Sequence, residues 1–201
     1  MAKKQLKKAK KILKPKFPEK IVKYLKDAGI PHEVLEHRTV YTAMDAAATM
    51  RKKLGEIAKS LLVKADKDYF LIILPADQNL DFKKLAKALA SLHKKKYAVV
   101  KIPGEKIMAE LLKLKEGTIS AFGKMHNLPV VVDKSLARVK KAVFSSGNHN
   151  YSVEMGLRDF IKLENALLAN FGVKKKIKLP KAVKKVKKVA KKLTKKTRKK
   201  K

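Results

Sequence analysis

Positive charge is concentrated at the two ends of the chain, and this distribution constrains folding more than any other feature. Residues 1–16 carry eight lysines and residues 173–201 carry seventeen Lys or Arg, and neither segment contains an Asp or Glu. Like charges at this density repel one another and keep a segment extended unless a polyanion neutralises them. We therefore predict two disordered basic tails that flank a folded body at residues 17–172.

The body has the composition of an ordinary folded domain. It contains 27 of the 52 basic residues and all 17 acidic residues, and 45% of the whole chain is hydrophobic, which suffices for a core. The chain has no cysteine, which excludes disulfides, zinc–thiolate sites and cysteine nucleophiles and fits a reducing compartment. The longest apolar run, from Tyr69 to Ala76, is too short to span a membrane, and the N-terminus lacks the apolar region of a secretory signal. We expect a cytoplasmic protein with no membrane partner.

The tails predict a polyanionic partner, because the formal net charge of the chain is +35. In the cytoplasm this partner is nucleic acid, whose phosphates the lysines would contact. The C-terminal tail has a narrow apolar stripe at Val183, Val186, Ala190 and Leu193, spaced as on a helix. Binding to anionic lipid through that stripe, or a tail that only improves solubility, are the alternatives.

Apolar periodicity and turn residues divide the body into helices and strands. Asp81 and the Thr42/Asp45 pair have the spacing of helix N-caps. Because helices interrupt the strands irregularly, we predict an α+β fold with a mixed sheet and packed helices. Helices are expected at residues 18–28, 43–53, 82–92, 105–114 and 157–168, and strands at 34–37, 57–63, 69–74, 97–102, 129–132, 142–144 and 151–155.

A search for established site motifs excludes several enzyme classes. The chain has no Gly-rich phosphate loop, no GxGxxG, no HExxH and no close His/carboxylate cluster, so no metal or cofactor is expected. The five histidines are scattered, and His32 and His37, which flank a short strand, are interpreted as packing or surface residues. No Ser–His–Asp arrangement can be assembled from the order of the residues.

Three glycines and one lysine stand out from this background. Gly117 and Gly123 flank one loop and Gly147 lies within another, where glycine permits a positive φ or a close approach of backbone to a ligand. Ordinary turns would explain them equally well. Lys59 begins an apolar strand, which is the usual place of a lysine whose ammonium reaches out to solvent from the strand end.

Motifs from about Ile30 to Leu163 occur in the order of a known family. The motifs are Thr42-Ala43 with Ala46-Ala47, Lys59 to Val63, Leu74 to Asp77, Asp81 with Leu85, Glu116-Gly117 with Ala121 to Gly123, Leu128 to Asp133, and Gly147 with His149 before Asp159-Phe160. In these motifs the chain resembles the YbaK family of aminoacyl-tRNA deacylases, which are related to the editing domain of bacterial prolyl-tRNA synthetases. This resemblance implies a mixed, mainly antiparallel sheet with packed helices.

The resemblance implies hydrolysis, in trans and without metal, of the ester that joins a wrong amino acid to tRNA, most often tRNA for proline. Lys59 matches the family lysine that holds the phosphate or ribose of the tRNA 3′ end. Backbone groups near Gly117 or Gly147 would orient the ester carbonyl and the attacking water. The resemblance also implies substrate-binding positions at Thr42, Ser60, Phe122, Gly123 and His149.

One residue departs from the family pattern, and two functions remain open. Ala121 occupies the position before Phe-Gly where the family commonly has proline.

The first hypothesis is an editing hydrolase that acts on tRNA, has basic tails that bind phosphates, and associates with an aminoacyl-tRNA synthetase. The alternative is a non-catalytic RNA-binding or ribosome-associated protein on the same fold. The amino acid that is removed cannot be read from the sequence.

Overall fold

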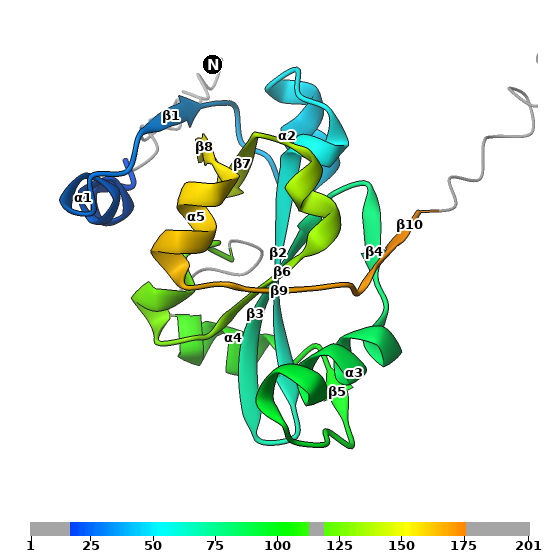
Figure 1. Ribbon diagram of the computed structural model, residues 1–201. Coiled ribbons are helices and arrows are strands. Elements are labelled where there is room, and N and C mark those ends of the chain that lie inside the picture. The colour runs from blue at the N-terminus through cyan, green and yellow to red at the C-terminus, as the bar shows by residue number, and fades with distance from the viewer. Residues whose placement is uncertain (1–16, 113–118, 176–201) are drawn as a thin grey trace, which may run out of the picture.

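The computed structural model describes residues 17–112 and 119–175, and the chain folds there into one main sheet with helices around it (Figure 1). The α-helices are α1 (Glu19–Asp27), α2 (Ala43–Thr49), α3 (Phe82–His93), α4 (Glu105–Leu112) and α5 (Leu157–Glu164). The strands are β1 (His32–Glu36), β2 (Ile57–Ala65), β3 (Asp68–Pro75), β4 (Gln78–Leu80), β5 (Val100–Lys101), β6 (Val130–Asp133), β7 (Lys141–Ser145), β8 (Tyr151–Gly156), β9 (Leu167–Ala169) and β10 (Gly172–Lys174).

The main sheet is mixed and mainly antiparallel, as expected. Its strand order is β1-β8-β7-β2-β3-β6-β9, and β5 pairs with the end of β2 outside this path. The β1/β8, β8/β7, β2/β3 and β2/β5 pairs are antiparallel, whereas β7/β2, β3/β6 and β6/β9 are parallel. A separate two-stranded ribbon joins β4 to β10.

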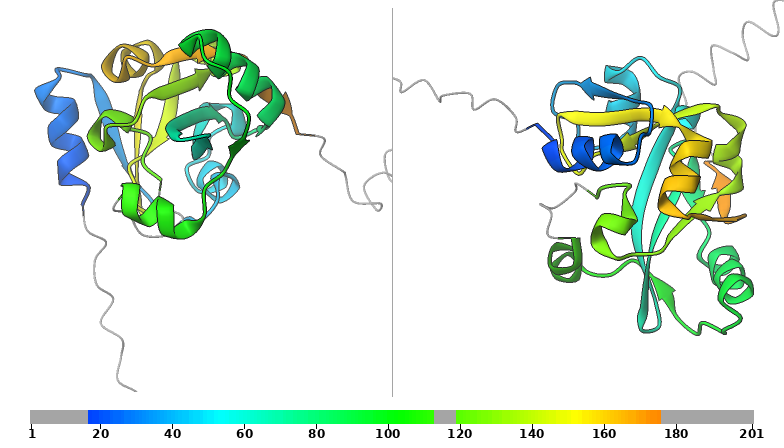
Figure 2. Two further views of the ribbon diagram at one scale, coloured as in Figure 1. Left: turned by 90° about the horizontal axis from the view of Figure 1, so that it is seen from below. Right: turned by 60° about the vertical axis from the view of Figure 1, so that its left-hand side comes forward.

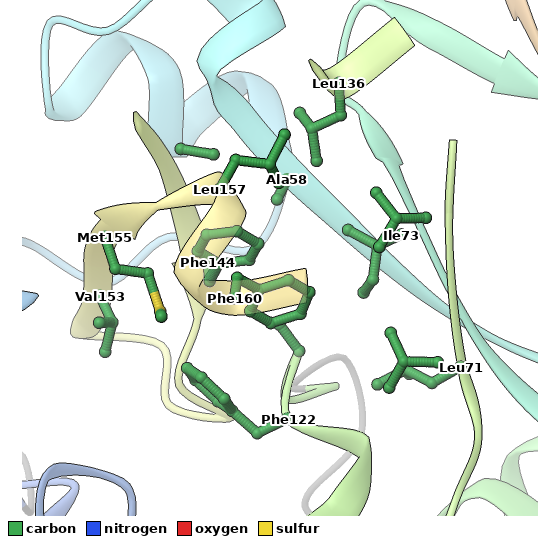
Figure 3. Packing of buried hydrophobic residues seen from close by; sticks show 14 of the residues in the cluster. Ala58, Leu71, Ile73, Phe122, Leu136, Phe144, Val153, Met155, Leu157 and Phe160 are labelled. Carbon is green, nitrogen blue, oxygen red and sulfur yellow. The ribbon is translucent and has the colours of Figure 1, made fainter. Parts of the chain in front are cut away.

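The central hairpin supplies side chains to both faces of the sheet. In β2, Ala58 and Leu62 belong to the largest buried cluster, while Val63 belongs to a second cluster on the other face. The first cluster includes apolar residues of α1, α4 and α5, and its aromatic centre is the stacked pair Phe144 and Phe160, with ring centroids 4.1 Å apart (Figure 3). The second is covered by α3, which lies on the opposite side of the molecule from α1 (Figure 2).

The predicted helix starts are confirmed, but two helices end earlier than expected. Thr42 and Asp81 cap α2 and α3 by accepting hydrogen bonds from backbone N–H groups. Helix α2 ends at Thr49, and Arg51 then has a φ of 53°. Helix α5 ends at Glu164 because Asn165 adopts the left-handed conformation, which turns the chain into β9. The apolar residues at 166–168, which continue the helical pattern, therefore belong mainly to a strand.

The strand predictions were correct for the long strands and incomplete for the short ones. The expected strand at residues 97–102 is reduced to Val100–Lys101, and β4, β9 and β10 were not predicted. In β10, Val173 and Lys174 pair with β4, although the charge pattern had assigned them to the C-terminal tail. Residues 1–16 and 176–201, which hold the rest of the predicted tails, lie outside the described residues. Within the described part of the chain, no helix is long and apolar enough to cross a membrane.

Asp133 joins the end of β6 to the chain before β10. Its buried carboxylate accepts hydrogen bonds from the backbone N–H groups of Phe171 (2.7 Å), Gly172 (2.6 Å) and Ser135 (2.8 Å), and from the Ser135 hydroxyl. Burial by itself would raise the pKa of Asp133, but these hydrogen bonds outweigh it and the pKa is lowered. The ionised side chain therefore holds three segments of the fold together.

We expect Asp133→Asn to lower the free energy of unfolding by about 2–3 kcal/mol at pH 7. The wild-type carboxylate accepts hydrogen bonds from three backbone N–H groups, whereas the NH₂ group of asparagine is a donor and cannot accept from them. The folded-state pKa is depressed, so this stabilisation is present above the ordinary aspartate pKa and is lost as the pH falls through the lowered value. Urea unfolding of both proteins at pH 7 and at acidic pH measures the effect. Asp27→Asn, at an exposed position in α1, is the control, and equal losses in the two variants would contradict the prediction.

Candidate functional site

One edge of β2 has two different neighbours, and a cleft lies beside the first of them, β7. Strand β7 pairs with Ile57 and Ala58 at the start of β2, while β5 pairs with Lys64 and Ala65 at its end. Among the described residues, no strand pairs with the intervening stretch 59–63 on this edge. The cleft measures about 430 Å³ and is lined by Val40, Tyr41, Thr42, Ala43, Ala46, Met50, Ile57, Ala58, Lys59, Ser60, Leu61, Ile119, Val143, Phe144, Ser145, Asn148, His149 and Ser152.

Lys59 brings a positive charge to the wall of this cleft. Its Nζ donates a hydrogen bond to the main-chain oxygen of Gln78 (3.0 Å), which fixes the side chain against the start of β4. Burial lowers the pKa of Lys59, and the charge of Lys175 lowers it further. Within the described ranges, no carboxylate lies within ion-pair distance of Lys59, so its remaining N–H donors can serve an anionic or carbonyl ligand.

Ser60 follows Lys59 and lines the same cleft. Because side chains alternate along a strand, Ser60 lies on the face of β2 that also carries Ala58 and Leu62. Its hydroxyl oxygen is buried and has no hydrogen-bond partner among the residues that the structure describes. The two adjacent residues therefore contribute to the cleft from opposite faces of the strand.

The loop between β7 and β8 forms another wall. Gly147 has a φ of +77°, a conformation that glycine adopts without strain and branched residues do not, and its N–H donates to the Ser145 hydroxyl (3.2 Å). The Asn148 side chain accepts from the Asn150 N–H (2.8 Å). These local hydrogen bonds hold the loop in a defined shape beside the cleft, which Asn148 and His149 line and Gly147 does not.

His149 ties this loop to the segment that precedes α2. The Val40 N–H donates to the His149 carbonyl (2.9 Å), and His149 Nδ1 lies 2.9 Å from the Val40 carbonyl. A carbonyl can only accept a hydrogen bond, so Nδ1 carries a proton, and in the neutral form of the ring Nε2 would carry the lone pair. His149 lines the cleft, where this nitrogen could accept a hydrogen bond from a ligand.

Thr42 also lines the cleft, but its hydroxyl is used to cap α2. It accepts from the Asp45 N–H (3.0 Å) and donates to the Asp45 carboxylate (2.9 Å). The structure thus explains this side chain by helix capping, which uses the hydroxyl proton and one of its two lone pairs.

Phe122 and Gly123, which the family resemblance places at the substrate, are buried in the structure and do not line the cleft. Phe122 is fully buried and packs edge-on against Phe160, with ring centroids 5.9 Å apart (Figure 3). Gly123 is buried as well, and a Cβ there would lie 2.4 Å from Val130 Cγ2 and 2.6 Å from the Leu128 oxygen. Core packing accounts for both residues. Gly117 lies outside the described residues.

Ala121, which stands where the family commonly has proline, makes a backbone hydrogen bond beside the cleft. The Ala121 N–H donates to the carbonyl of Ser145 (3.0 Å), which ties the segment entering the core to the end of β7 beside the cleft. A proline at this position has no N–H and could not make this hydrogen bond. The alanine therefore supports the cleft wall by a contact that the usual family residue cannot form.

Two contributors to the cleft were missed in the sequence. The Gln78 carbonyl that anchors Lys59 is a main-chain atom, and no residue type marks it. Tyr41 stands on the rim with 73% of its surface exposed, and its position directly before the N-cap Thr42 was an available signal.

Among the described residues, no three His, Asp or Glu side chains are close enough to hold a metal ion.

Solved structures share this fold. A hypothetical protein, APE2540, is 22% identical, with a TM-score of 0.67 over 77% of this chain and 99% of that one. A proposed trans-editing enzyme for prolyl tRNA synthetase is 21% identical, with a TM-score of 0.66 over 78% of this chain and 96% of that one. No curated protein matches the chain. The model of the aminoacyl-tRNA editing domain matches residues 37–163, and the chain belongs to this family.

Proposed function

We propose that the protein is an editing hydrolase that acts in trans and cleaves the ester of a mischarged aminoacyl-tRNA. The observation that carries the proposal is the half-buried Lys59, which has no carboxylate partner among the described residues and lies in a cleft of the editing-domain fold. A small amino acid on tRNA for proline is the first substrate to test. The protein would act in the cytoplasm, where an aminoacyl-tRNA synthetase is a further candidate partner.

Lys59 would hold the 3′ end of the tRNA through a charge-assisted contact to phosphate or ribose. The unpaired edge of β2 after Ala58 and the backbone around Gly147 would supply fixed dipoles for the ester carbonyl. Ser60 would lie beside the amino acid, and His149 would orient the substrate or the water through Nε2. Lys59, Ser60 and His149 line the same cleft.

The reaction needs little acid–base assistance. Water adds to the ester carbonyl carbon, the carbonyl oxygen becomes an oxyanion, and the bond to the ribose oxygen then breaks as that oxygen takes up a proton. The products are the free amino acid and the uncharged tRNA. Because such an ester is activated, positioning and oxyanion stabilisation, with help from the neighbouring ribose hydroxyl, would suffice without a catalytic triad.

Incubation of the purified full-length protein with a panel of tRNAs that carry alanine, cysteine, serine or threonine tests the proposal. Loss of the ester is followed over time, with correctly charged prolyl-tRNA as the control. Faster loss than in buffer for at least one mischarged tRNA is the expected result. RNA binding without acceleration on any member of the panel would favour a non-catalytic RNA-binding protein.

We expect Gly147→Val to lower kcat for deacylation by about tenfold or more while changing tRNA affinity much less. The branched side chain disfavours the positive φ, so it would shift the backbone of this loop and with it Asn148 and His149, which line the cleft. Kinetics with saturating and limiting tRNA separate the two effects.

Gly29→Val is a matched control for backbone strain. Gly29 has a φ of +65°, a Cβ added to it would have no atom within 4 Å, and it lies outside the cleft. A similar loss of kcat in this control would assign the Gly147 effect to folding. His149→Ala tests whether the histidine assists: a loss comparable to that of Gly147→Val gives it a role in the site, and unchanged kinetics makes it a bystander.

A further inference from the structure

Tyr41 presents an aromatic ring to solvent at the mouth of the cleft. It lines the cleft, yet 73% of its surface is exposed, which is more than for any other large hydrophobic side chain that the structure describes. Its ring lies 4.9 Å from the His149 ring, centroid to centroid, at an angle of 51°. The ring is therefore supported on one side by a residue of the cleft and open on the other.

The backbone on both sides of Tyr41 is held in place. Val40 makes two hydrogen bonds with His149, one through each of its backbone polar groups. Thr42 caps α2 through its side chain. An exposed ring on a fixed backbone loses little conformational freedom when a ligand covers it, so it is suited to bind a flat apolar group.

We propose that Tyr41 is a stacking platform for the terminal base of the RNA whose ester the cleft receives. Unpaired bases at RNA ends are commonly bound by stacking on aromatic side chains. Lys59 lies in the same cleft and offers a cation for the phosphate or ribose of that nucleotide. A nucleotide has both a flat base and an anionic backbone, and the ester would enter the cleft between these two contacts. This inference rests on the proposed RNA substrate.

The test compares two short uncharged RNA oligonucleotides, one that ends in CCA and one with an abasic residue in place of the terminal adenosine. Both present the same phosphates, so the basic segments of the full-length protein bind them equally. The ratio of their dissociation constants isolates the contribution of the terminal base. For the wild-type protein we expect the abasic RNA to bind about tenfold more weakly, as is typical for one stacked base.

Tyr41→Ala should abolish this difference, and Tyr41→Phe should retain it because the phenyl ring also stacks. Met44→Ala is the matched control: Met44 is 62% exposed on the neighbouring helix but does not line the cleft, so the tenfold difference should remain. In NMR spectra of the complex, the H2 and H8 protons of the terminal adenine should shift upfield with Tyr41 or Phe and not with Ala.

Equal binding of the two RNAs by the wild-type protein, or a difference that survives in Tyr41→Ala, would overturn the stacking role. The measurement uses uncharged RNA and needs no catalysis. An inactive protein that still discriminates the terminal base through Tyr41 would contradict the proposed hydrolysis and leave this inference standing. An active protein that binds the two RNAs equally would support the proposed hydrolysis and contradict the stacking role of Tyr41.

Discussion

Removal of residues 1–16 and 176–201 is expected to lower the affinity of the protein for tRNA by orders of magnitude near physiological salt. The two segments carry 23 positive charges, eight in the first and fifteen in the second, and no acidic residue. This deletion keeps β10, which pairs with β4. If six lysines contact phosphates, the slope of log affinity against log salt concentration falls by about four to five, because fewer counterions are released on binding.

The same deletion should leave hydrolysis at saturating substrate close to that of the full-length protein, because every residue that lines the cleft lies between positions 40 and 152. The loss of affinity should be similar for different tRNAs, since lysine–phosphate contacts do not read bases. Titrations at several salt concentrations with two unrelated tRNAs measure both effects. An unchanged slope, or weakened binding of only one tRNA, would contradict a general electrostatic role.

Replacement of Lys59 by alanine is expected to lower the rate of deacylation by about tenfold to 150-fold. The side chain would provide one charge-assisted contact to the substrate, worth about 1.5–3 kcal/mol if it tightens in the transition state. Single-turnover measurements with a sensitive mischarged tRNA give this rate directly. Near wild-type activity would remove Lys59 from the mechanism.

Lys59→Met and Lys64→Ala separate this effect from folding. Lys64 lies on the same strand, with its ammonium over the ring of Tyr69 and outside the cleft, so its loss should leave the rate unchanged. Because burial lowers the pKa of Lys59, the folded protein disfavours the charged form, and Lys59→Met should not reduce the free energy of unfolding at pH 7. Activity that needs the ammonium should decline as the pH rises through the lowered pKa, which a pH–rate profile would detect.

Much of the secondary structure could be predicted because it depends on interactions between residues close in sequence. The caps at Thr42 and Asp81 and the β2/β3 hairpin follow from short spacings, and the structure contains each of them. Short strands were missed because pairing with a distant strand makes them. In β10, for example, Val173 pairs with Asn79, whereas the lysines that follow Val173 in the sequence indicate the start of a basic tail.

For motif residues in the core, the structure offers an explanation by packing. Phe122 and Gly123 stand in a motif that resembles the family, but their types are explained by packing against Phe160 and Val130. A motif in sequence does not distinguish a residue that touches the ligand from one that supports the wall behind it. Burial makes that distinction, and it depends on contacts between residues far apart in the chain.

The sequence by itself determined the order of the helices and the longer strands, the mixed sheet, the division of charge between body and ends and, through the family resemblance, the prediction that Lys59 is functional. Only the tertiary structure decided where the cleft lies, because its walls combine segments that are far apart in the sequence, from Val40 to Ser152. It also decided how Lys59 is held and that Tyr41 is exposed. The physical reason is that strand pairing and main-chain carbonyls act between distant segments through atoms common to all residues, so the identities of the side chains do not reveal them.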